Sequence, residues 1–202
     1  MTKIGQLRLP SVFSSSFLSK EHDRADLLAR IAAKDRAALA ELYQRFQKPL
    51  YSYLFHLLGQ AELAEDTFQE VMLIVWQKAH TYKGKSALEC WIFGIAHHQA
   101  CKTLRHHPKS IFLELDAALE IPDEALTPEA NAVRKATGEE VHRALASLTF
   151  EHREVLELAF YQEFSCKEIA AIVGIPEGTV KSRLSYARRS LKVALLQNGW
   201  EV

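Results

Sequence analysis

Apolar residues recur at steps of three and four along most of this chain. The first long series begins at residue 23 and includes Leu27, Leu28, Ile31, Leu39, Leu42, Tyr43, Phe46, Leu50 and Leu54. This spacing places the apolar side chains on one face of an α-helix. Pro49 interrupts the series, so we expect a kink or a helix boundary there.

More helices follow the first series. We expect one helix at about 63–80 and another at about 88–106, with a loop that begins at Tyr82 between them. Pro108 ends this block. Residues 109–137 differ in character, because they contain two further prolines and six acidic residues. Helical periodicity returns at 138 and continues to about 196.

These patterns predict an all-α protein made of two small helical domains joined by an acidic linker. We expect a flexible, serine-rich N-terminal arm at 1–22 and a first domain at 23–108. The linker would occupy 109–137 and the second domain 138–202. The sequence contains neither a strand pattern nor an internal repeat of fixed period.

Composition narrows the functional classes only slightly. The 202 residues include 25 basic and 25 acidic side chains, so the net charge gives no sign of nucleic-acid binding. Three cysteines without paired spacing do not form a disulfide framework, which indicates a reducing compartment. The sequence shows no signal-peptide pattern and no run of the roughly 20 apolar residues that a membrane span needs. We expect a cytoplasmic protein without direct membrane insertion.

The strongest local motif lies at 165–192 and predicts a helix-turn-helix. Ser165 and Glu168 have the spacing of a capping box at the start of a helix. Gly174 stands where a helix end needs a left-handed residue, Ile175 would be the buried residue of the turn, and Pro176 would open the next helix. A turn of this kind between two amphipathic helices is what a helix-turn-helix requires.

The second helix of this motif is locally basic although the whole chain is neutral. Such a helix can enter the major groove and read base edges with its N-terminal part. Backbone N–H groups near its start could also hold a phosphate. The candidate DNA-binding residues are Glu177, Gly178, Thr179, Lys181, Ser182, Arg183, Tyr186 and Arg188. An alternative is that this basic face is only solvated.

Several motifs in order resemble the sigma-70 family of transcription initiation factors. The runs 148–156, 168–170, 178–184 and 187–191 are similar to region 4 of that family. Upstream, Asp66, Gln69, Glu70, Val71 and Trp76 resemble region 2.2, and Trp91, Ile92, Ile95, Ala96 and Arg105 resemble regions 2.3 and 2.4. The chain is most similar to the extracytoplasmic-function group, which keeps only regions 2 and 4 and a short linker.

The resemblance implies a non-enzymatic protein with no catalytic residue and no cofactor. Region 2 would dock on the clamp of the polymerase β′ subunit, which places Asp66, Gln69 and Glu70 at that contact. Region 4 would read the minus-thirty-five element of promoter DNA and touch the β flap. The core RNA polymerase is then the main partner, and an anti-sigma factor, with a small membrane protein as one candidate, would mask these surfaces.

Region 2 would also capture the melted minus-ten strand. Single-stranded nucleic acid is held by cationic grooves with planar side chains. The candidate residues for this site are Tyr82, Lys83, Lys85, Ser86, His97, His98, Lys102 and Arg105. His98, Lys102 and Tyr186 depart from the residues common in the family, so the preferred promoter sequence is not carried over. We expect Trp91 in the core, whereas Tyr82 fits either core or pocket.

Two other functions are compatible with parts of the sequence. A helix-turn-helix regulator that binds an operator without polymerase would need only the C-terminal half. A metal-dependent enzyme could be built on the histidines and the cysteine at 97–107, since His97 and Cys101 are one helical turn apart. Two ligands do not make a site, so we expect no bound metal. The acidic linker could occupy a cationic channel of the polymerase or act as a solvated tether.

Overall fold

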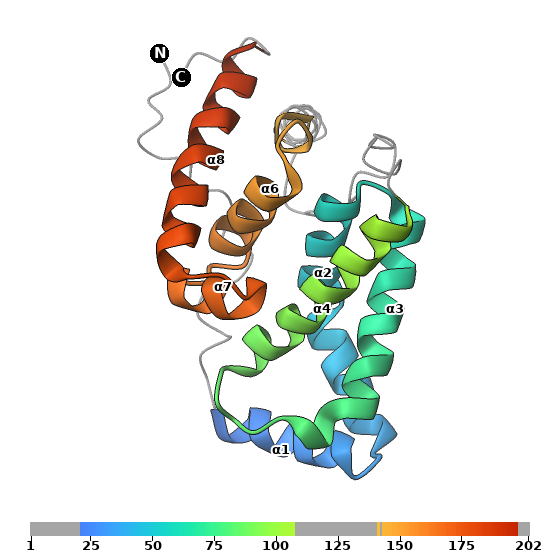
Figure 1. Cartoon of the computed structure of the whole chain (residues 1–202). Helices are drawn as coiled ribbons and strands as arrows, with labels where there is room; N and C mark the ends of the chain where they lie inside the picture. The colour runs from blue at the N-terminus through green and yellow to red at the C-terminus, as the bar shows by residue number, and fades with distance from the viewer. Residues whose placement is uncertain (1–20, 108–140, 142, 198–202) are drawn as a thin grey trace, which may run out of the picture.

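The computed structural model describes residues 21–107, 141 and 143–197, and every regular element in these ranges is helical. The predicted all-α fold is therefore confirmed for the described part. Residues 1–20 of the predicted N-terminal arm and the predicted acidic linker at 109–137 lie outside it, while helix α1 begins at Glu21 and so includes the last two residues of the predicted arm. Figure 1 shows the arrangement of the elements. They are α1 (Glu21–Ala32), α2 (Arg36–Leu58), α3 (Ala61–Lys78), the 3₁₀ turn η3 (Ala79–Thr81), α4 (Leu88–His106), α6 (Phe150–Leu156), the π-helical η5 (Glu157–Tyr161), α7 (Cys166–Val173) and α8 (Glu177–Gln197).

The longest helix, α2, continues through the proline that interrupts its apolar series. Asp35 caps its start by accepting hydrogen bonds from the N–H groups of Ala37 and Ala38. Gly59 ends it in the left-handed conformation with φ 74°. Pro49 is buried within the helix, so a helix boundary at this position is excluded. A bend at Pro49 remains a prediction, because proline has no backbone N–H to donate to the preceding turn of the helix.

Helices α2, α3 and α4 pack as a bundle, with α1 across one end (Figure 1). Their shared core is made of fully buried side chains, among them Leu42, Phe46, Leu50, Leu54 and Ile92. The expected helix at 88–106 is found with those bounds as α4. Trp91 is half-buried rather than enclosed, and it packs against the edge of the core.

The C-terminal half contains the predicted helix-turn-helix, made of α7 and α8. Ser165 and Glu168 form the predicted capping box, since each side chain bonds the other residue's backbone N–H. Gly174 ends α7 with φ 75°, as the sequence predicted. Helix α8 begins at Glu177, directly after Pro176, whose carbonyl accepts from the N–H of Thr179.

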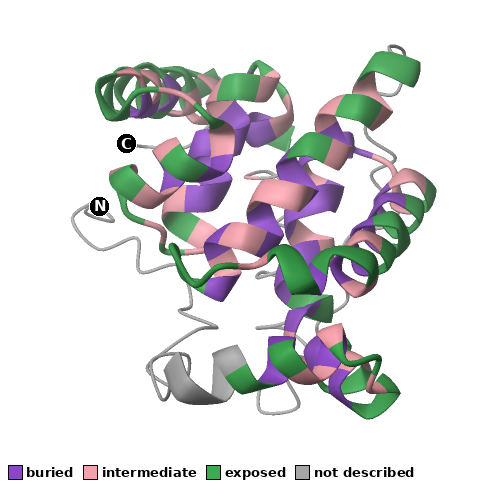
Figure 2. Cartoon of the chain, turned by 60° about the horizontal axis from the view of Figure 1, so that its bottom comes forward, coloured by how far each residue is buried: buried purple, intermediate pink, exposed green. Residues whose placement is uncertain are grey.

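The two halves of the described chain pack directly against each other. Helix α7 lies on α4, and α6 lies on α2, so one continuous apolar core crosses both halves (Figure 2). Phe93 of α4 and Phe164, which precedes α7, meet edge to face with ring centroids 5.2 Å apart. A Cβ added to Gly94 would lie 4.0 Å from the Ile172 carbonyl oxygen, so α4 approaches α7 closely here. None of the helices described is long and apolar enough to cross a bilayer.

Candidate polymerase and nucleic-acid surfaces

The residues predicted to bind polymerase lie together on the exposed face of α3. Asp66, Gln69 and Glu70 are spaced at three and four residues, and all three are exposed. The same face continues to Leu73, whose side chain is 55% exposed although it is large and apolar. A single exposed leucine is ordinary on a protein surface, but Leu73 also lines an apolar groove together with neighbouring side chains. The resemblance did not assign Leu73, but its helical spacing from Gln69 and Glu70 could have identified it.

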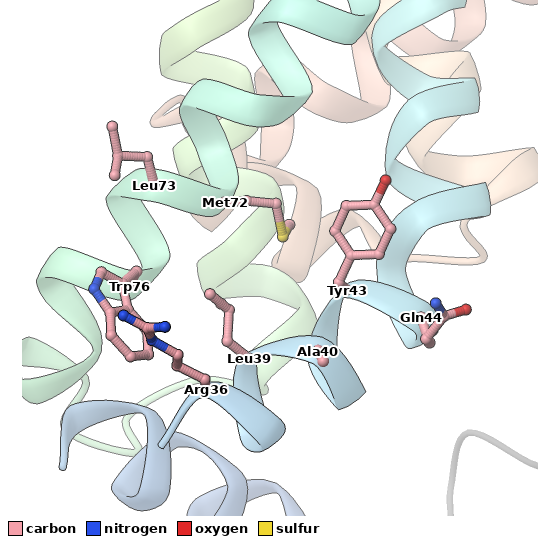
Figure 3. A pocket seen from close by; sticks show the side chains of 8 residues that line it. All are labelled: Arg36, Leu39, Ala40, Tyr43, Gln44, Met72, Leu73 and Trp76. Carbon is pink, nitrogen blue, oxygen red and sulfur yellow. The ribbon is translucent and has the colours of Figure 1, made fainter. Parts of the chain in front are cut away.

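This face borders an apolar groove between α2 and α3. Leu39 and Tyr43 come from α2, and Met72, Leu73 and Trp76 come from α3 (Figure 3). The groove has a volume of about 570 Å³. Lys34 borders Trp76, because its ammonium lies 4.8 Å from the ring centroid and donates to the Trp76 carbonyl oxygen. The α3 face thus joins acidic groups to an apolar depression.

The loop before α4 holds the first residues of the predicted minus-ten site. The Tyr82 hydroxyl donates to the Ser86 carbonyl oxygen at 2.6 Å, and its ring lies 5.5 Å from the Trp91 ring. These contacts give Tyr82 a role in shaping the loop. Lys83 and Lys85 are exposed at its tip, around Gly84 with φ 67°. The hydrogen bond from Tyr82 to Ser86 therefore closes the loop, and the two lysines at its tip are exposed to solvent.

Three other predicted minus-ten residues lie exposed along α4. They are His98, Lys102 and Arg105. Lys102 lies 3.5 Å from the Glu70 carboxylate of α3, with both side chains about half exposed (54% and 52%). The predicted polymerase surface and the predicted minus-ten surface are consequently neighbours. Such an exposed pair contributes little to stability, so both groups are free to exchange partners.

His97 is not on this surface. It is buried, 8% exposed, where α4 meets the C-terminal half. Its Nδ1 lies 2.5 Å from Oε1 of Glu154 in α6, and the same carboxylate oxygen accepts from the Tyr53 hydroxyl at 2.8 Å. The Cys101 sulfur lies 3.9 Å from the His97 ring. In this arrangement the imidazole contacts another part of the protein and is closed to DNA.

The electrostatics of this cluster favour a charged imidazole. Burial lowers the pKa of His97, but the Cys101 thiol and the Glu154 carboxylate outweigh it and raise the pKa to about 10. Burial also raises the pKa of the Tyr53 phenol well above its usual value, and the nearby Glu154 carboxylate adds to this effect. Tyr53 therefore stays a neutral donor, and His97 and Glu154 form an ion pair away from water.

Two more buried charges of the C-terminal half face α2. Arg153 is 3% exposed and donates to carbonyl oxygens near the end of α2, those of His56 at 3.1 Å and Leu57 at 3.4 Å. It also donates to Leu145, Ala146 and Leu148 in its own half. Glu157 is fully buried, and its Oε2 lies 2.9 Å from Nδ1 of His56. The Arg153 guanidinium thus caps a helix end of the other half of the molecule.

The predicted recognition helix, α8, keeps most of its candidate residues exposed. Lys181 pairs with Glu177 one turn earlier, with Nζ and Oε1 2.7 Å apart, and the Ser182 hydroxyl donates to the Gly178 carbonyl at 3.0 Å. Thr179 and Arg183 are half-buried. Because the N–H of Thr179 already bonds Pro176, the predicted phosphate site is reduced to the N–H groups at the two preceding positions.

An aromatic cluster lies further along α8. The Tyr186 ring is 58% exposed and stacks on His152 of α6 with centroids 6.5 Å apart. The Arg189 guanidinium lies 5.9 Å from the centroid of the same ring. Arg188 lies 5.1 Å from the centroid of Phe160. Two arginines of this helix, Arg188 and Arg189, therefore lie over aromatic rings, where cation–π attraction favours their positions.

Both halves match described protein families. Residues 42–109 match Sigma-70 region 2, and residues 144–193 match Sigma-70, region 4. The ECF RNA polymerase sigma factor RpoE of Cereibacter sphaeroides is 33% identical over 184 residues, which cover 87% of this chain and 98% of that protein. The ECF RNA polymerase sigma factor SigL of Mycobacterium tuberculosis is 33% identical over 170 residues, covering 83% and 94%.

Solved structures share the fold at lower identity. The chain resembles CnrH, solved in complex with the cytosolic domain of CnrY, with a TM-score of 0.65 and 21% identity, covering 87% of this chain and 98% of that one. It also resembles the sigma factor RpoE of Bartonella quintana, solved with the anti-sigma factor NepR. That match has a TM-score of 0.60 and 23% identity and covers 79% and 99%.

Proposed function

The chain belongs to the ECF group of the sigma-70 family, whose members direct RNA polymerase to promoters and are not enzymes, and from this premise we propose how its surfaces divide that work. The observation that carries the proposal is that region 2 and region 4 occur in one chain, in family order, each with an exposed candidate surface. An operator-binding regulator would have no use for the region-2 surface.

The acidic and apolar face of α3 docks on the polymerase. Asp66, Gln69 and Glu70 supply polar contacts, and Leu73 supplies apolar area beside the groove of Figure 3. Interfaces of this kind gain most of their energy from a few apolar anchors surrounded by polar groups. The partner surface is the clamp of the β′ subunit. Region 4 touches the β flap.

The loop 82–87 and the exposed face of α4 hold the melted minus-ten strand. Lys83, Lys85, Lys102 and Arg105 attract phosphates, and His98 offers a planar surface to an unstacked base. Gly84 lets the strand approach the backbone, since nothing lies within 4 Å of a Cβ placed there. Separating the two DNA strands costs a few kcal/mol per base step. The contacts of these side chains with the melted strand offset that cost.

Helix α8 reads the duplex minus-thirty-five element. Its exposed N-terminal part carries Gly178, Lys181 and Ser182, where a recognition helix contacts base edges. Arg188 and Tyr186 lie two turns further on and contact the backbone. The N–H groups of Glu177 and Gly178 bind a phosphate at the helix start.

An anti-sigma factor is the regulator that we propose for this protein. Its support is the similarity in fold to the sigma factor RpoE of Bartonella quintana, which was solved with the anti-sigma factor NepR. We place the protein in the cytoplasm, where core polymerase and promoter DNA are found. A membrane-bound anti-sigma factor would connect it to signals from outside the cell.

Run-off transcription on a genomic fragment library tests the function without knowledge of the promoter. Core polymerase with this protein should give new transcripts whose 5′ ends share two upstream elements. Core polymerase alone should not give these transcripts. The double variant Lys83→Ala with Lys85→Ala should still bind polymerase but lose affinity for a fork-junction form of the recovered promoter. Affinity equal to wild type would remove the loop from the minus-ten site.

A further inference from the structure

The contact between the two halves contains three buried charged side chains close together in the sequence. Within five residues, Arg153, Glu154 and Glu157 are each 3% exposed or less. All three face region 2, where their partners include Tyr53, His97 and the end of α2. Taking a charge out of water is unfavourable, and a buried pair offsets this only when its geometry is good. Such groups fix one specific arrangement but recover their hydration when separated.

We propose that the Tyr53–Glu154–His97 network, together with the Arg153 cap on α2, is a latch that holds the factor closed until it engages polymerase and promoter. The inference rests on the proposed function, because the two promoter contacts are what require the halves to separate. The latch is built from this chain alone and acts without an anti-sigma factor.

The dimensions of the promoter require the latch to open. Elements centred near minus ten and minus thirty-five are about 25 base pairs apart, which is about 85 Å along B-DNA. A packed chain of this length has a radius of gyration of about 17 Å and is therefore roughly 45 Å across. The closed molecule cannot place α4 on one element and α8 on the other.

The closed form also covers a predicted nucleic-acid helix. Helix α7 packs along α4, and His97 points into the contact and away from solvent. The edge-to-face rings of Phe93 and Phe164 seal the same contact. Closing therefore removes part of the minus-ten helix from solvent and ties the first helix of the DNA-binding motif to it.

Charge exchange across the latch tests the proposal. Glu154→Lys puts a cation beside His97, and His97→Glu puts a second carboxylate beside Glu154. The double variant His97→Glu with Glu154→Lys restores an opposite pair. Glu41→Lys is the control, because it reverses the charge of an exposed partner of Arg30 (3.3 Å). Small-angle scattering gives the radius of gyration of each full chain, and circular dichroism verifies its helix content.

We expect each single variant to raise the radius of gyration by about a quarter or more, and the double variant and the control to match wild type. If nine-tenths of the free factor is closed, the open variants should also bind core polymerase about tenfold more tightly. Single variants that keep their helix content and also keep the wild-type radius of gyration would overturn the latch. So would a double variant as expanded as the singles.

A variant that loses helix content is replaced by the milder Glu154→Gln, which keeps the shape of the side chain and removes its charge. Glu154→Gln should expand the molecule less than Glu154→Lys, and no expansion at all would count against the latch. The two proposals fail separately. Wild-type protein that never binds polymerase would defeat the proposed function, while the scattering series still decides whether the latch exists.

Discussion

At the scale of single residues, the molecule places its strongest electrostatic interactions inside, between its halves. Arg153 donates to five carbonyl oxygens, two of them near the end of α2. Hydrogen bonds to a charged group are worth about 1.5–3 kcal/mol each, and a buried charge left without them is costly. The exposed pairs Glu70–Lys102 and Glu177–Lys181 are weaker and can be replaced by polymerase or DNA.

The charge of His97 should make the closed form depend on pH. Its pKa of about 10 in the closed form lies above the ordinary 6.5 expected once the halves separate. The stabilisation is therefore complete below pH 6.5 and is lost as the pH rises toward 10. We expect the radius of gyration to increase over that window. The groups facing the imidazole are Glu154 from α6 and Cys101 and His98 from α4 itself, and Tyr53 from α2 donates to the same Glu154 carboxylate.

The matched control for the pH series is His97→Gln, which keeps a polar side chain in α4 but does not titrate. Its radius of gyration should change much less between pH 6.5 and 9.5 than that of wild type. Tyr53 contributes little in this window, since burial raises the pKa of its phenol well above the usual value. Equal slopes for the two proteins would assign the pH dependence to another group.

Leu73 should matter for polymerase binding and little for folding. Its side chain is 55% exposed, so Leu73→Asp removes few internal contacts and should change the free energy of unfolding by about 0.5 kcal/mol or less. A charge at an apolar anchor should weaken association with core polymerase at least tenfold. Ser190→Asp, which adds the same charge on the exposed side of α8, is the control in a co-sedimentation assay. Equal binding by both variants would place the docking site elsewhere.

At the scale of elements, local signals were enough to predict the helix-turn-helix. The capping box at Ser165 and the left-handed Gly174 are short-range features, and the structure contains both. The bounds of α4 were also predicted, because Gly84 and Pro108 flank a clear apolar period. Of the two alternatives predicted at Pro49, a kink or a helix boundary, the structure excludes the boundary, since tertiary packing of α2 overrides the local cost of a proline.

Two glycines in the motif should respond to alanine in opposite ways. Gly174 has φ 75°, which L side chains rarely adopt, so Gly174→Ala should destabilise the protein by about 1 kcal/mol. Gly178 lies inside α8 with open space around a new Cβ, so Gly178→Ala should stabilise it by up to about 1 kcal/mol. Urea unfolding of both variants measures the difference. The same sign for both would contradict the assigned end of α7.

At the scale of the whole molecule, the sequence did not predict how the halves pack. The His97–Glu154 contact joins residues 57 positions apart, and the Tyr53–Glu154 contact joins residues 101 apart, so no local period encodes either of them. A clue was available in α6, where charged residues occupy positions next to Val155 and Leu156 that then prove to be buried. Without the partner surface in view, the sequence alone does not place these charges in a contact between the halves. His97 was assigned to the DNA surface for the same reason.

The thiol of Cys90 reports on this packing directly. Cys90 is 5% exposed, and burial together with the carboxylates of Glu168 in α7 and Glu89 raises its pKa from 9 to about 12. Since the thiolate is the reactive form, separation of α4 from α7 should return the pKa toward 9 and raise the thiolate fraction about a thousandfold. Nucleophilicity falls with the pKa, so the gain in rate is smaller. We expect iodoacetamide to modify Cys90 at least tenfold faster in Glu154→Lys than in wild type.

Peptide mass spectrometry separates Cys90 from the partly exposed Cys166, which serves as the internal control because it lies at the start of α7. Cys166 should react at similar rates in both proteins. If the whole C-terminal half had unfolded, both thiols would accelerate together and the unfolding would appear in the circular dichroism. Acceleration of Cys90 alone means that two folded halves have moved apart. An unchanged Cys90 rate in an otherwise folded Glu154→Lys would show that the apolar contacts hold α4 on α7 without the buried charges.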